Sequence, residues 1–338
     1  MGTGGIGHGS FFLLEGNATL GREESRAGRF LDRRDYCKLH IICHYVKALL
    51  GEGFDVSPVG RVGRDSDGAR LTLEMEAIGL DTRFVGIAEA APTLFSFCFL
   101  YPDGSGGNLT TRDSASGTVD ARAVRTAEPL MESLGSAGIA LAVPEVPLAA
   151  RRSLLEQAVQ HGLFRAASFT RAEMEEVRAS GVLALVELCA LNLEEAAAAA
   201  GIPHDRVLPG DPAEIAEQSV ESLSRSYPRL QLSITAGKTG SWSWDRHELA
   251  FDAAAAVKVE GASGAGDAHF AGLLAGLSAN LSLPEAQQVG TIVAGASVTS
   301  PHTIHPGMTS ALLRSICGLR AWTSARVLAL LDTANGGP

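Results

Sequence analysis

The residues best suited to chemistry stand together in Gly264-Ala265-Gly266-Asp267, directly before an apolar helical stretch. Glycines ahead of a helix let a ligand approach the backbone, and the first turn of a helix offers free N–H groups with partial positive charge. An aspartate at that point can act as a general base beside a bound phosphate. The same four residues also suit an ordinary helix start with an acidic first turn. Taken alone, they leave both interpretations open.

The helix that follows Asp267 is the first element needed to position it. Its apolar residues recur at i, i+3, i+4 and i+7, which is typical of a helix packed against a core. These residues are Phe270, Leu273, Leu274 and Leu277. Helices are also expected at 40–50 and 70–79, where apolar residues lie on one helical face and a glycine marks the end.

Short apolar runs alternate with helical stretches from about residue 136 onward. Strands are expected at 138–143, 182–186 and 230–234, with a helix near 147–161. This alternation predicts an α/β fold with a doubly wound, mostly parallel sheet. An aromatic run at 93–101 ends in a Pro-Asp-Gly turn and predicts a further strand.

Residues 263–272 (SGAGDAHFAG) closely resemble the signature D-T-x-G-A-G-D-x-F of the ribokinase-like (PfkB) carbohydrate kinases. Five more segments fall in the family's order. They are VGRVGRDSDG at 59–68, GLDT at 79–82 with Thr93, VPEVP at 143–147, NLEE at 192–195 and TAGKTG at 235–240. Six ordered matches are far more specific than any one of them, and they span about residues 55–310.

The resemblance implies a single ribokinase-like domain over 1–338, with a small β-strand lid on the α/β core. The lid would come from about 8–36 and 83–113, including strands near 83–88 and 93–101. Residues 114–330 would form the nucleotide-binding part of the core. A lid closed over the acceptor would exclude water and so suppress hydrolysis of ATP.

The activity implied by the resemblance is an ATP-dependent transfer of the γ-phosphate to a hydroxyl of a sugar or sugar-like molecule. Asp267 would be the general base that accepts the hydroxyl proton. The backbone amides of Gly264, Ala265 and Gly266 would form an anion hole for the transferred phosphoryl group.

The cofactors implied by the resemblance are ATP and Mg²⁺. Asn192 and Glu195 would reach Mg²⁺ through water, because this ion keeps much of its hydration shell. The same pair forms a capping-box pattern before five alanines, and both roles can hold together. The remaining nucleotide contacts implied by the family are Thr235, Gly237, Gly240, Ser263 and Val298, with 298–305 at the adenine end.

Residues 22–38 carry more positive than negative charge in an otherwise acidic chain. In the family, this stretch supplies the first lid strands and the turn that contacts the sugar. The candidate substrate residues here are Arg33, Arg34, Asp35 and Lys38. Guanidinium groups suit carboxylate or phosphate, so an acidic or phosphorylated sugar is one expectation. A solvated surface with weak ion pairs is the alternative, and both stay open.

The chain also departs from the family pattern. Gly261-Ala262 replaces the D-T before the glycines, so this loop offers no carboxylate for a monovalent cation. The N-terminal Gly-Gly sugar motif is not evident, and the usual first strand is expected to be short, supplied differently or missing. These losses favour a second hypothesis, a catalytically silent sugar or nucleotide sensor, whereas Asp267 argues against it. A nucleoside kinase of the same fold is a further alternative.

Three other motif matches in the sequence do not indicate the site that they resemble. Residues 2–7 satisfy G-x-G-x-x-G, but no strand precedes them, so a dinucleotide fingerprint is not expected. Residues 237–239 (GKT) look like the end of a Walker A loop, but its earlier glycine is replaced by Leu232. His40 and His44 have the spacing of two zinc ligands, yet no third ligand suggests itself.

The composition bounds the classes of function. The chain has 338 residues, 28 Lys and Arg against 38 Asp and Glu, and a formal charge of −10. Since 46% of its residues are hydrophobic, a globular core is expected rather than disorder. An acidic chain is unsuited to general nucleic-acid binding, which requires a basic surface. The expected partner is therefore a small molecule.

The cysteines and the N-terminus indicate a cellular compartment. The five cysteines are scattered and form no C-x-x-C pair, as expected in a reducing compartment; they are Cys37, Cys43, Cys98, Cys189 and Cys317. No secretory signal and no apolar stretch of membrane-spanning length are evident, so no membrane partner is expected. The sequence favours a cytoplasmic protein. Family lids sometimes pair, so a homodimer is also an expectation from the resemblance.

Overall fold

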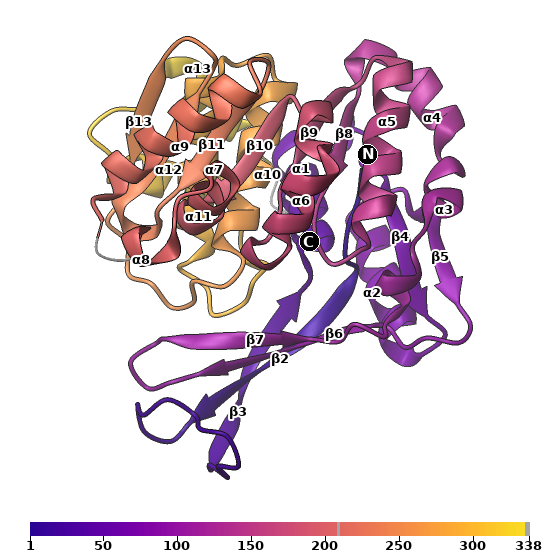
Figure 1. Cartoon of the computed structure of the whole chain (residues 1–338), viewed down its shortest axis with the longest axis vertical. Coiled ribbons are helices and arrows are strands. Elements are labelled where there is room, and N and C mark those ends of the chain that lie inside the picture. The colour runs from indigo at the N-terminus through magenta and orange to yellow at the C-terminus, as the bar shows by residue number, and fades with distance from the viewer. Residues whose placement is uncertain (208–209, 335–338) are drawn as a thin grey trace.

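The large sheet of this protein has nine strands in the order β13-β12-β11-β10-β9-β8-β1-β4-β5 (Figure 1). The computed structural model describes residues 1–207 and 210–334. All neighbours from β11 to β5 pair in parallel, and only β12 and β13 join antiparallel at one edge. The predicted α/β fold with a mostly parallel sheet is confirmed.

The apolar strands of the large sheet are short, as expected where helices cover both faces. They are β1 (Gly2–Thr3), β4 (Pro58–Gly63), β5 (Val85–Ala88), β8 (Ile139–Ala142), β9 (Phe164–Ala167), β10 (Leu188–Asn192), β11 (Gln231–Thr235), β12 (Gly240–Trp244) and β13 (Leu249–Ala253). The first strand is only two residues long but lies mid-sheet between β4 and β8. The glycines of 2–7 therefore join two strands, because β2 begins at Gly7.

Helices cover both faces of this sheet, and each set packs its apolar side into a separate core. One set comprises α1 (Lys38–Leu50), α2 (Ser66–Ala77), α10 (Ala265–Ser278), α11 (Leu283–Ser297), α12 (Ser310–Cys317) and α13 (Ala325–Asp332). The other comprises α3 (Ala121–Arg125), α4 (Glu128–Leu134), α5 (Leu148–His161), α6 (Met174–Ser180), α7 (Leu193–Ala200) and α9 (Pro212–Ser226), with the short α8 (His204–Val207) beside α7.

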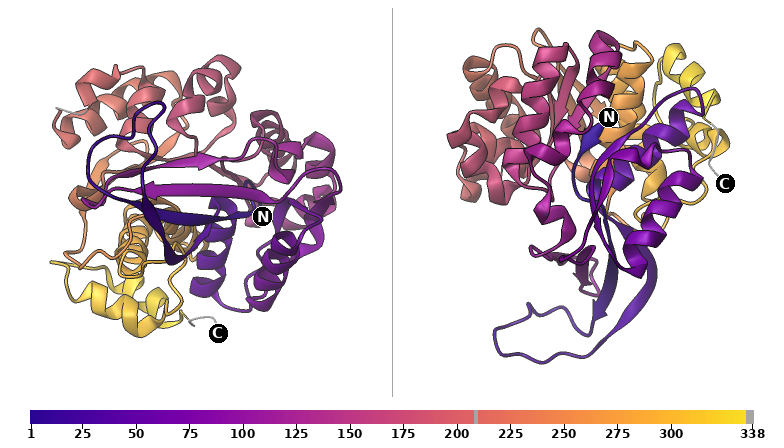
Figure 2. Two further views of the ribbon diagram at one scale, coloured as in Figure 1. Left: turned by 90° about the horizontal axis from the view of Figure 1, so that it is seen from below. Right: turned by 90° about the vertical axis from the view of Figure 1, so that its right-hand side faces the viewer.

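A second, four-stranded sheet projects from one end of the α/β part (Figures 1 and 2). Its order is β3-β2-β6-β7, and its strands are β2 (Gly7–Leu14), β3 (Gly28–Tyr36), β6 (Leu94–Leu100) and β7 (Gly106–Thr110). We call it the small sheet. The expectation that 83–88 also belongs to the lid is wrong, because β5 pairs in parallel with β4 at the edge of the large sheet.

The strand expected at 182–186 is also wrong. Residues Val182–Leu185 form a 3₁₀ turn, and the strand lies at β10 instead. Val182 and Leu183 are buried in the core beneath α5 and α6. Burial of a turn therefore produced an apolar run that periodicity alone cannot distinguish from a strand.

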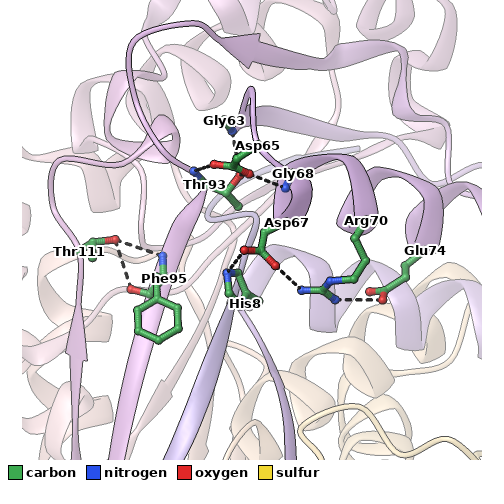
Figure 3. A network of polar contacts seen from close by, with 10 residues as sticks. All are labelled: His8, Gly63, Asp65, Asp67, Gly68, Arg70, Glu74, Thr93, Phe95 and Thr111. Carbon is green, nitrogen blue, oxygen red and sulfur yellow. Dashed lines mark hydrogen bonds and ion pairs between the residues drawn. The ribbon is translucent and has the colours of Figure 1, made fainter.

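Asp65 ties the small sheet to the α/β part (Figure 3). Its carboxylate caps α2 by accepting a hydrogen bond from the Gly68 N–H at 2.7 Å. It also accepts bonds from the N–H and the hydroxyl of Thr93, at 2.7 and 2.6 Å, immediately before β6. Nearby, His8 of β2 contacts Asp67 of α2 at 3.2 Å. Polar contacts rather than a shared core thus link these elements.

Candidate active site

Asp267 lies in the first turn of α10, three residues after Gly264. Gly264 has a φ of +78°, a left-handed conformation that glycine adopts without strain. A Cβ at this position would also lie 3.1 Å from the side chain of Thr303. The helix itself is fixed by its apolar stripe, since Phe270, Leu273 and Leu274 are buried. The predicted helix start and its packing face are both confirmed.

A cavity of about 90 Å³ lies in front of this helix start. It brings together residues from six separate parts of the chain: the starts of α1 and α10 and the segments at the ends of β8, β9, β10 and β11. The predicted site residues among its lining are Lys38, Asn192, Glu195, Thr235, Gly266 and Asp267. Ligands bind open α/β sheets at the carboxyl ends of the strands, and this cavity lies there.

Lys38 is the cation of the cavity. Its Nζ lies 3.3 Å from Oδ1 of Asp267, which is 229 residues away in sequence. Burial raises the pKa of the Asp267 carboxyl, and the Lys38 ammonium opposes that shift. Attraction to Asp267 raises the pKa of Lys38, and Glu145 and Glu195 act in the same direction. One ammonium therefore faces three carboxyl groups, which leaves the site favourable for a further cation.

Asn192 and Glu195 form the capping box that their spacing indicates. The Asn192 side chain accepts a hydrogen bond from the Glu195 N–H at 2.9 Å, and Glu195 accepts one from the Asn192 N–H at 2.8 Å. Burial raises the pKa of Glu195, and the bond from Asn192 opposes this shift. The second carboxylate oxygen of Glu195 remains available beside Asp267, so an oxygen donor fit for a hydrated Mg²⁺ is present.

Direct metal coordination finds no support elsewhere in the described ranges. Within residues 1–207 and 210–334, no three His, Cys, Asp or Glu side chains are arranged to hold a metal ion together. Binding through water at Asn192 and Glu195 is compatible with this finding, because it requires few protein ligands.

Glu145 is a residue of the site to which sequence reasoning gave no role. It follows β8 with a φ of +75°, an uncommon conformation for a side chain other than glycine. Its Oε2 accepts the Lys38 N–H at 3.0 Å, at the start of α1, where the N-cap Cys37 provides no side-chain cap. Burial raises the pKa of Glu145 to about 7, and Lys38 opposes this shift. The sequence signal for it was the VPEVP segment at 143–147, which resembles a segment of the family but was given no role.

Of the residues expected to contact the nucleotide, Thr235 lines the cavity and the other four do not. Gly237 lies in an exposed turn after β11, and Gly240 begins β12, where a Cβ would lie 2.3 Å from the Asp252 carbonyl oxygen. Ser263 is exposed just before Gly264. The Val298 carbonyl at the end of α11 accepts the Glu260 N–H at 2.8 Å and so anchors the strand-to-helix connection.

The candidate substrate residues of β3 lie in different surroundings in the structure and do not form one site. Asp35 is buried, accepts a hydrogen bond from the Cys98 thiol at 3.6 Å, and has its pKa raised to about 6, chiefly by burial. Arg33 stacks over the ring of Phe11 at 5.8 Å. Arg34 lines a different cavity, on α1 and α2, so the structure does not bring it to Asp267.

Comparison with known proteins identifies the family. The sequence model of the pfkB family carbohydrate kinases matches residues 44–310, which is well over half of the chain. This protein belongs to the pfkB family of carbohydrate kinases. The match includes every segment that carries the resemblance, from VGRVGRDSDG through the Asp267 signature.

Individual relatives are distant. The chain is 27% identical over 263 residues to Bifunctional protein HldE of Methylobacillus flagellatus. The matched region covers 76% of this chain and 51% of that protein, so the chain spans about half the length of this relative. Among solved structures it resembles ribokinase from Giardia lamblia (TM-score 0.76, 17% identity, 88% and 93% of the two chains). It also resembles Burkholderia thailandensis nucleoside kinase in complex with inosine (0.67, 18%, 99% and 98%).

Ribokinase from Cryptococcus neoformans in complex with ADP gives a TM-score of 0.74 at 18% identity, covering 94% and 98% of the two chains. These likenesses establish the ribokinase-like fold of this pfkB-family protein. Across the part of the chain that the structure describes, none of the helices combines the length and apolarity needed to traverse a bilayer.

Proposed function

We propose that this pfkB-family protein is an ATP-dependent kinase that transfers the γ-phosphate to a hydroxyl group of a sugar or sugar-like molecule. The observation that carries the proposal is the meeting of Asp267, Lys38 and Glu195 at one cavity, at the start of α10. Phosphoryl transfer requires mainly positioning and charge stabilisation, and this arrangement supplies both.

In the proposed step, the acceptor oxygen forms a bond to the γ-phosphorus while the bond to the β-phosphate oxygen breaks. ADP leaves with that electron pair, and the hydroxyl proton passes to the Asp267 carboxylate. The amides of Gly264, Ala265 and Gly266 stabilise the charge on the transferred group. A buried carboxylate with a raised pKa is a better proton acceptor than an exposed one.

Mg²⁺, when bound, would neutralise charge on the ATP phosphates. Glu195 and Asn192 would hold it through water, and their capping box fixes both side chains at the end of β10. Thr235 and Gly237 would contact the nucleotide phosphates, and Gly240, Ser263 and Val298 would shape its binding site. The α1 cation, Lys38, would compensate the negative charge of Asp267 while the acceptor is absent.

We infer that the acceptor is a neutral polyhydroxyl compound. Asp35 is a buried acidic residue of the small sheet, and the charge of Asp267 makes a small contribution to the raised pKa of its carboxyl. A sugar hydroxyl can donate a hydrogen bond to Asp35, whereas a carboxylate or phosphate there would be repelled. With Arg34 at another cavity, the expectation of an acidic acceptor has lost its main support.

We also propose a homodimer in which small sheets pair. Phe30 on β3 is 65% exposed and Leu109 on β7 is 62% exposed. Phe30 contacts Phe12 and Phe97, with ring centroids 5.1 and 6.3 Å apart, so the exposed face is aromatic. Light scattering on the unchanged protein and on the Phe30→Ser variant would test this. The mass of a dimer is expected for the unchanged protein, and the mass of a monomer for the variant.

A cytoplasmic location is proposed from the thiols. The five cysteines are free, and four of them are buried. Thiols persist in a reducing compartment, which is the reason for this assignment. Fractionation of cells that make the protein would test it.

The test of the kinase is ADP release across a panel of sugars and nucleosides with MgATP. Turnover that depends on one acceptor is expected, and Asp267→Asn should lower it by about 10²–10⁴-fold. Asp113→Asn, an exposed carboxylate elsewhere, should leave it unchanged. Tight sugar binding without turnover would instead favour the silent sensor, and a preference for nucleosides would favour a nucleoside kinase. Near-normal turnover of Asp267→Asn would remove Asp267 from the mechanism.

A further inference from the structure

Arg151 is a cation that lies in the interior of the protein, near the start of α5. Its side chain is 1% exposed, and it lies outside the lining of the cavity at Asp267. Its guanidinium forms two hydrogen bonds with the Glu173 carboxylate: Nη1 donates to Oε1 at 3.0 Å, and Nη2 donates to Oε2. A planar fork on a carboxylate fixes the orientation of both side chains. Nothing in the proposed phosphoryl transfer uses this pair.

Stability alone does not account for this buried ion pair. Moving two charges out of water costs free energy, and an apolar pair of similar size often stabilises a protein more. The Nε of Arg151 is also buried, and it has no hydrogen-bond partner within residues 1–207 and 210–334. An unpaired buried donor adds a further cost. What the pair does supply is a fixed geometry between α5 and the residues around Glu173.

The carboxylate of Glu173 also closes the turn that follows β9. Its Oε1 accepts the Thr170 N–H at 2.8 Å, and Thr170 and Glu173 form a capping box. Residues Arg171–Glu173 form a 3₁₀ turn that leads into α6. We call residues 168–173 the β9–α6 turn. Because Arg151 binds the same carboxylate, the position of this turn relative to α5 depends on the ion pair.

The β9–α6 turn forms one wall of the cavity at Asp267, since Ser168 and Phe169 are part of its lining. Phe169 is 1% exposed, and the Arg151 guanidinium lies over its ring, 5.5 Å from the ring centre. A cation is attracted to the face of an aromatic ring. Arg151 therefore contacts this wall directly at Phe169, as well as through Glu173.

The same turn contacts the start of α7, which carries the Asn192–Glu195 capping box. Nη1 of Arg171 lies 3.9 Å from Oε2 of Glu194, between the two residues of that box. Asn192 and Glu195 both line the cavity, on the side assigned to Mg²⁺ in the proposed function. A shift of the β9–α6 turn would thus act on two walls of a cavity of only about 90 Å³.

We propose that Arg151 is a positioning residue: through Glu173 and Phe169 it holds the β9–α6 turn and the Asn192–Glu195 box in the arrangement that binds a magnesium–nucleotide complex. This role deepens the proposed function and rests on it, because that function assigns the complex to this cavity. Arg151 itself touches neither nucleotide nor metal. A displacement of about 1 Å is enough to weaken a binding group strongly, so loss of the pair should weaken nucleotide binding.

Two ion pairs beside β9 provide a matched comparison. The double variant Arg151→Met/Glu173→Gln removes both charges, so no unpaired buried charge remains, and Gln still offers a side-chain oxygen to the turn. The control is Arg165→Met/Glu187→Gln, which removes a pair with 3.0 Å between Nη2 and Oε2. Arg165 lies near the start of β9 rather than its end, and neither control residue lines the cavity. Arg151→Lys, which keeps the charge but not the fork, replaces the first variant if that one does not fold.

Calorimetry of MgADP binding is the first measurement. The Kd should rise by about tenfold or more in the Arg151 variant and stay unchanged in the control. Where turnover is measured, KM for MgATP should rise and KM for the acceptor should not, a split that a general loss of stability would not produce. Unchanged MgADP affinity in a folded variant of Arg151, or an equal loss of affinity in the control, would overturn the proposal.

Hydrogen exchange of the unliganded protein is the second measurement, and it requires neither nucleotide nor turnover. Amides at 168–173 and 192–197 should exchange faster in the Arg151 variant than in the control. Faster exchange confined to 168–173 would overturn the proposal, because the pair would then hold only its own turn. A protein that shows the expected changes in affinity and exchange but phosphorylates no acceptor would contradict the proposed kinase and support the role of Arg151.

Discussion

Lys38 sets the charge balance at the Asp267 carboxyl group. Its ammonium lies 3.3 Å from Asp267 and opposes the rise in pKa that burial imposes on that carboxyl. The proposed general base must be ionised to accept a proton. The fraction of active protein at a given pH therefore depends on a residue that does not itself receive the proton.

Replacing Lys38 by methionine is expected to raise the pKa of Asp267. Because a protonated Asp267 cannot act as a base, the acid limb of the pH profile of kcat/KM should move to higher pH. Rates near pH 6 should fall more than rates near pH 8. Arg225→Gln, which removes an exposed cation of α9, serves as control and should leave the limb in place. A limb that is unmoved in Lys38→Met would show that Lys38 does not act on Asp267.

The sequence predicted which residues belong to the site better than it predicted which side chains they contact. Gly264, Asp267 and the Asn192–Glu195 box were found because each is a local pattern whose meaning depends on neighbours in the chain. The pairing of Lys38 with Asp267 joins residues 229 apart, which no local pattern encodes. Arg34 was assigned to the acceptor for its charge, but β3 directs it to the other cavity.

At the scale of elements, the N-terminus of α1 is capped by a side chain from another part of the chain. Its N-cap offers no side-chain bond, and Glu145 from the end of β8 accepts the Lys38 N–H instead. Burial holds the pKa of Glu145 at about 7, above its ordinary value of 4.5. The folded protein therefore retains this proton between about pH 4.5 and 7, whereas the unfolded chain releases it.

This difference predicts that stability falls as pH rises through that window, because the folded state binds more protons there. The free energy of unfolding should drop by about 1–3 kcal/mol between pH 5 and pH 8 from this group. Glu145→Gln keeps an acceptor for Lys38 but cannot ionise, so its loss over the window should be smaller. Denaturant unfolding at four pH values measures this. An identical slope for the variant, with Glu221→Gln as exposed control, would exclude Glu145 as its source.

The loop before α10 leads to a prediction about ions. Gly261 lies against the Ser300 and Pro301 carbonyl oxygens, at 3.0 and 3.2 Å from where its Cβ would be, and carries no carboxylate to complete a cation site. Turnover should require Mg²⁺ but change little when K⁺ replaces Na⁺ at constant ionic strength. Initial rates in matched chloride salts measure this. Strong, saturable activation by K⁺ would show that other residues supply the missing ligand.

Helices and strands could be predicted where the spacing of apolar residues is compatible with only one kind of secondary structure. The stripe of α10 has a period that only a helix explains, and its residues are buried as expected. The run at 182–186 suits either a strand or a buried turn, and the turn occurs. For 85–88 the sequence suggested a strand correctly but not its sheet, because pairing with β4 is a tertiary contact.

At the scale of the whole molecule, the small sheet joins the α/β part through polar contacts and through Tyr36, which packs against the core of that part. The α/β part provides Asp267, Asn192 and Glu195 to the cavity, whereas Asp35 of the small sheet is buried outside its lining. Asp65 is one link between them, through Thr93 (Figure 3). Burial opposes ionisation of Asp65, but the bonds from Thr93 and Gly68 outweigh it and lower the pKa of its carboxyl.

Asp65→Ala removes the acceptor for Thr93 and the cap of α2 together, and should lower the free energy of unfolding by about 1–3 kcal/mol. Because the small sheet would be held less firmly, water should reach the phosphoryl group more often. ADP release without acceptor should therefore rise relative to release with acceptor. Asp120→Ala is the matched control, since it also caps a helix, α3, but does not contact the small sheet. If both variants lose stability and neither changes that ratio, Asp65 acts as a helix cap only, and the small sheet is positioned by its own strand pairing.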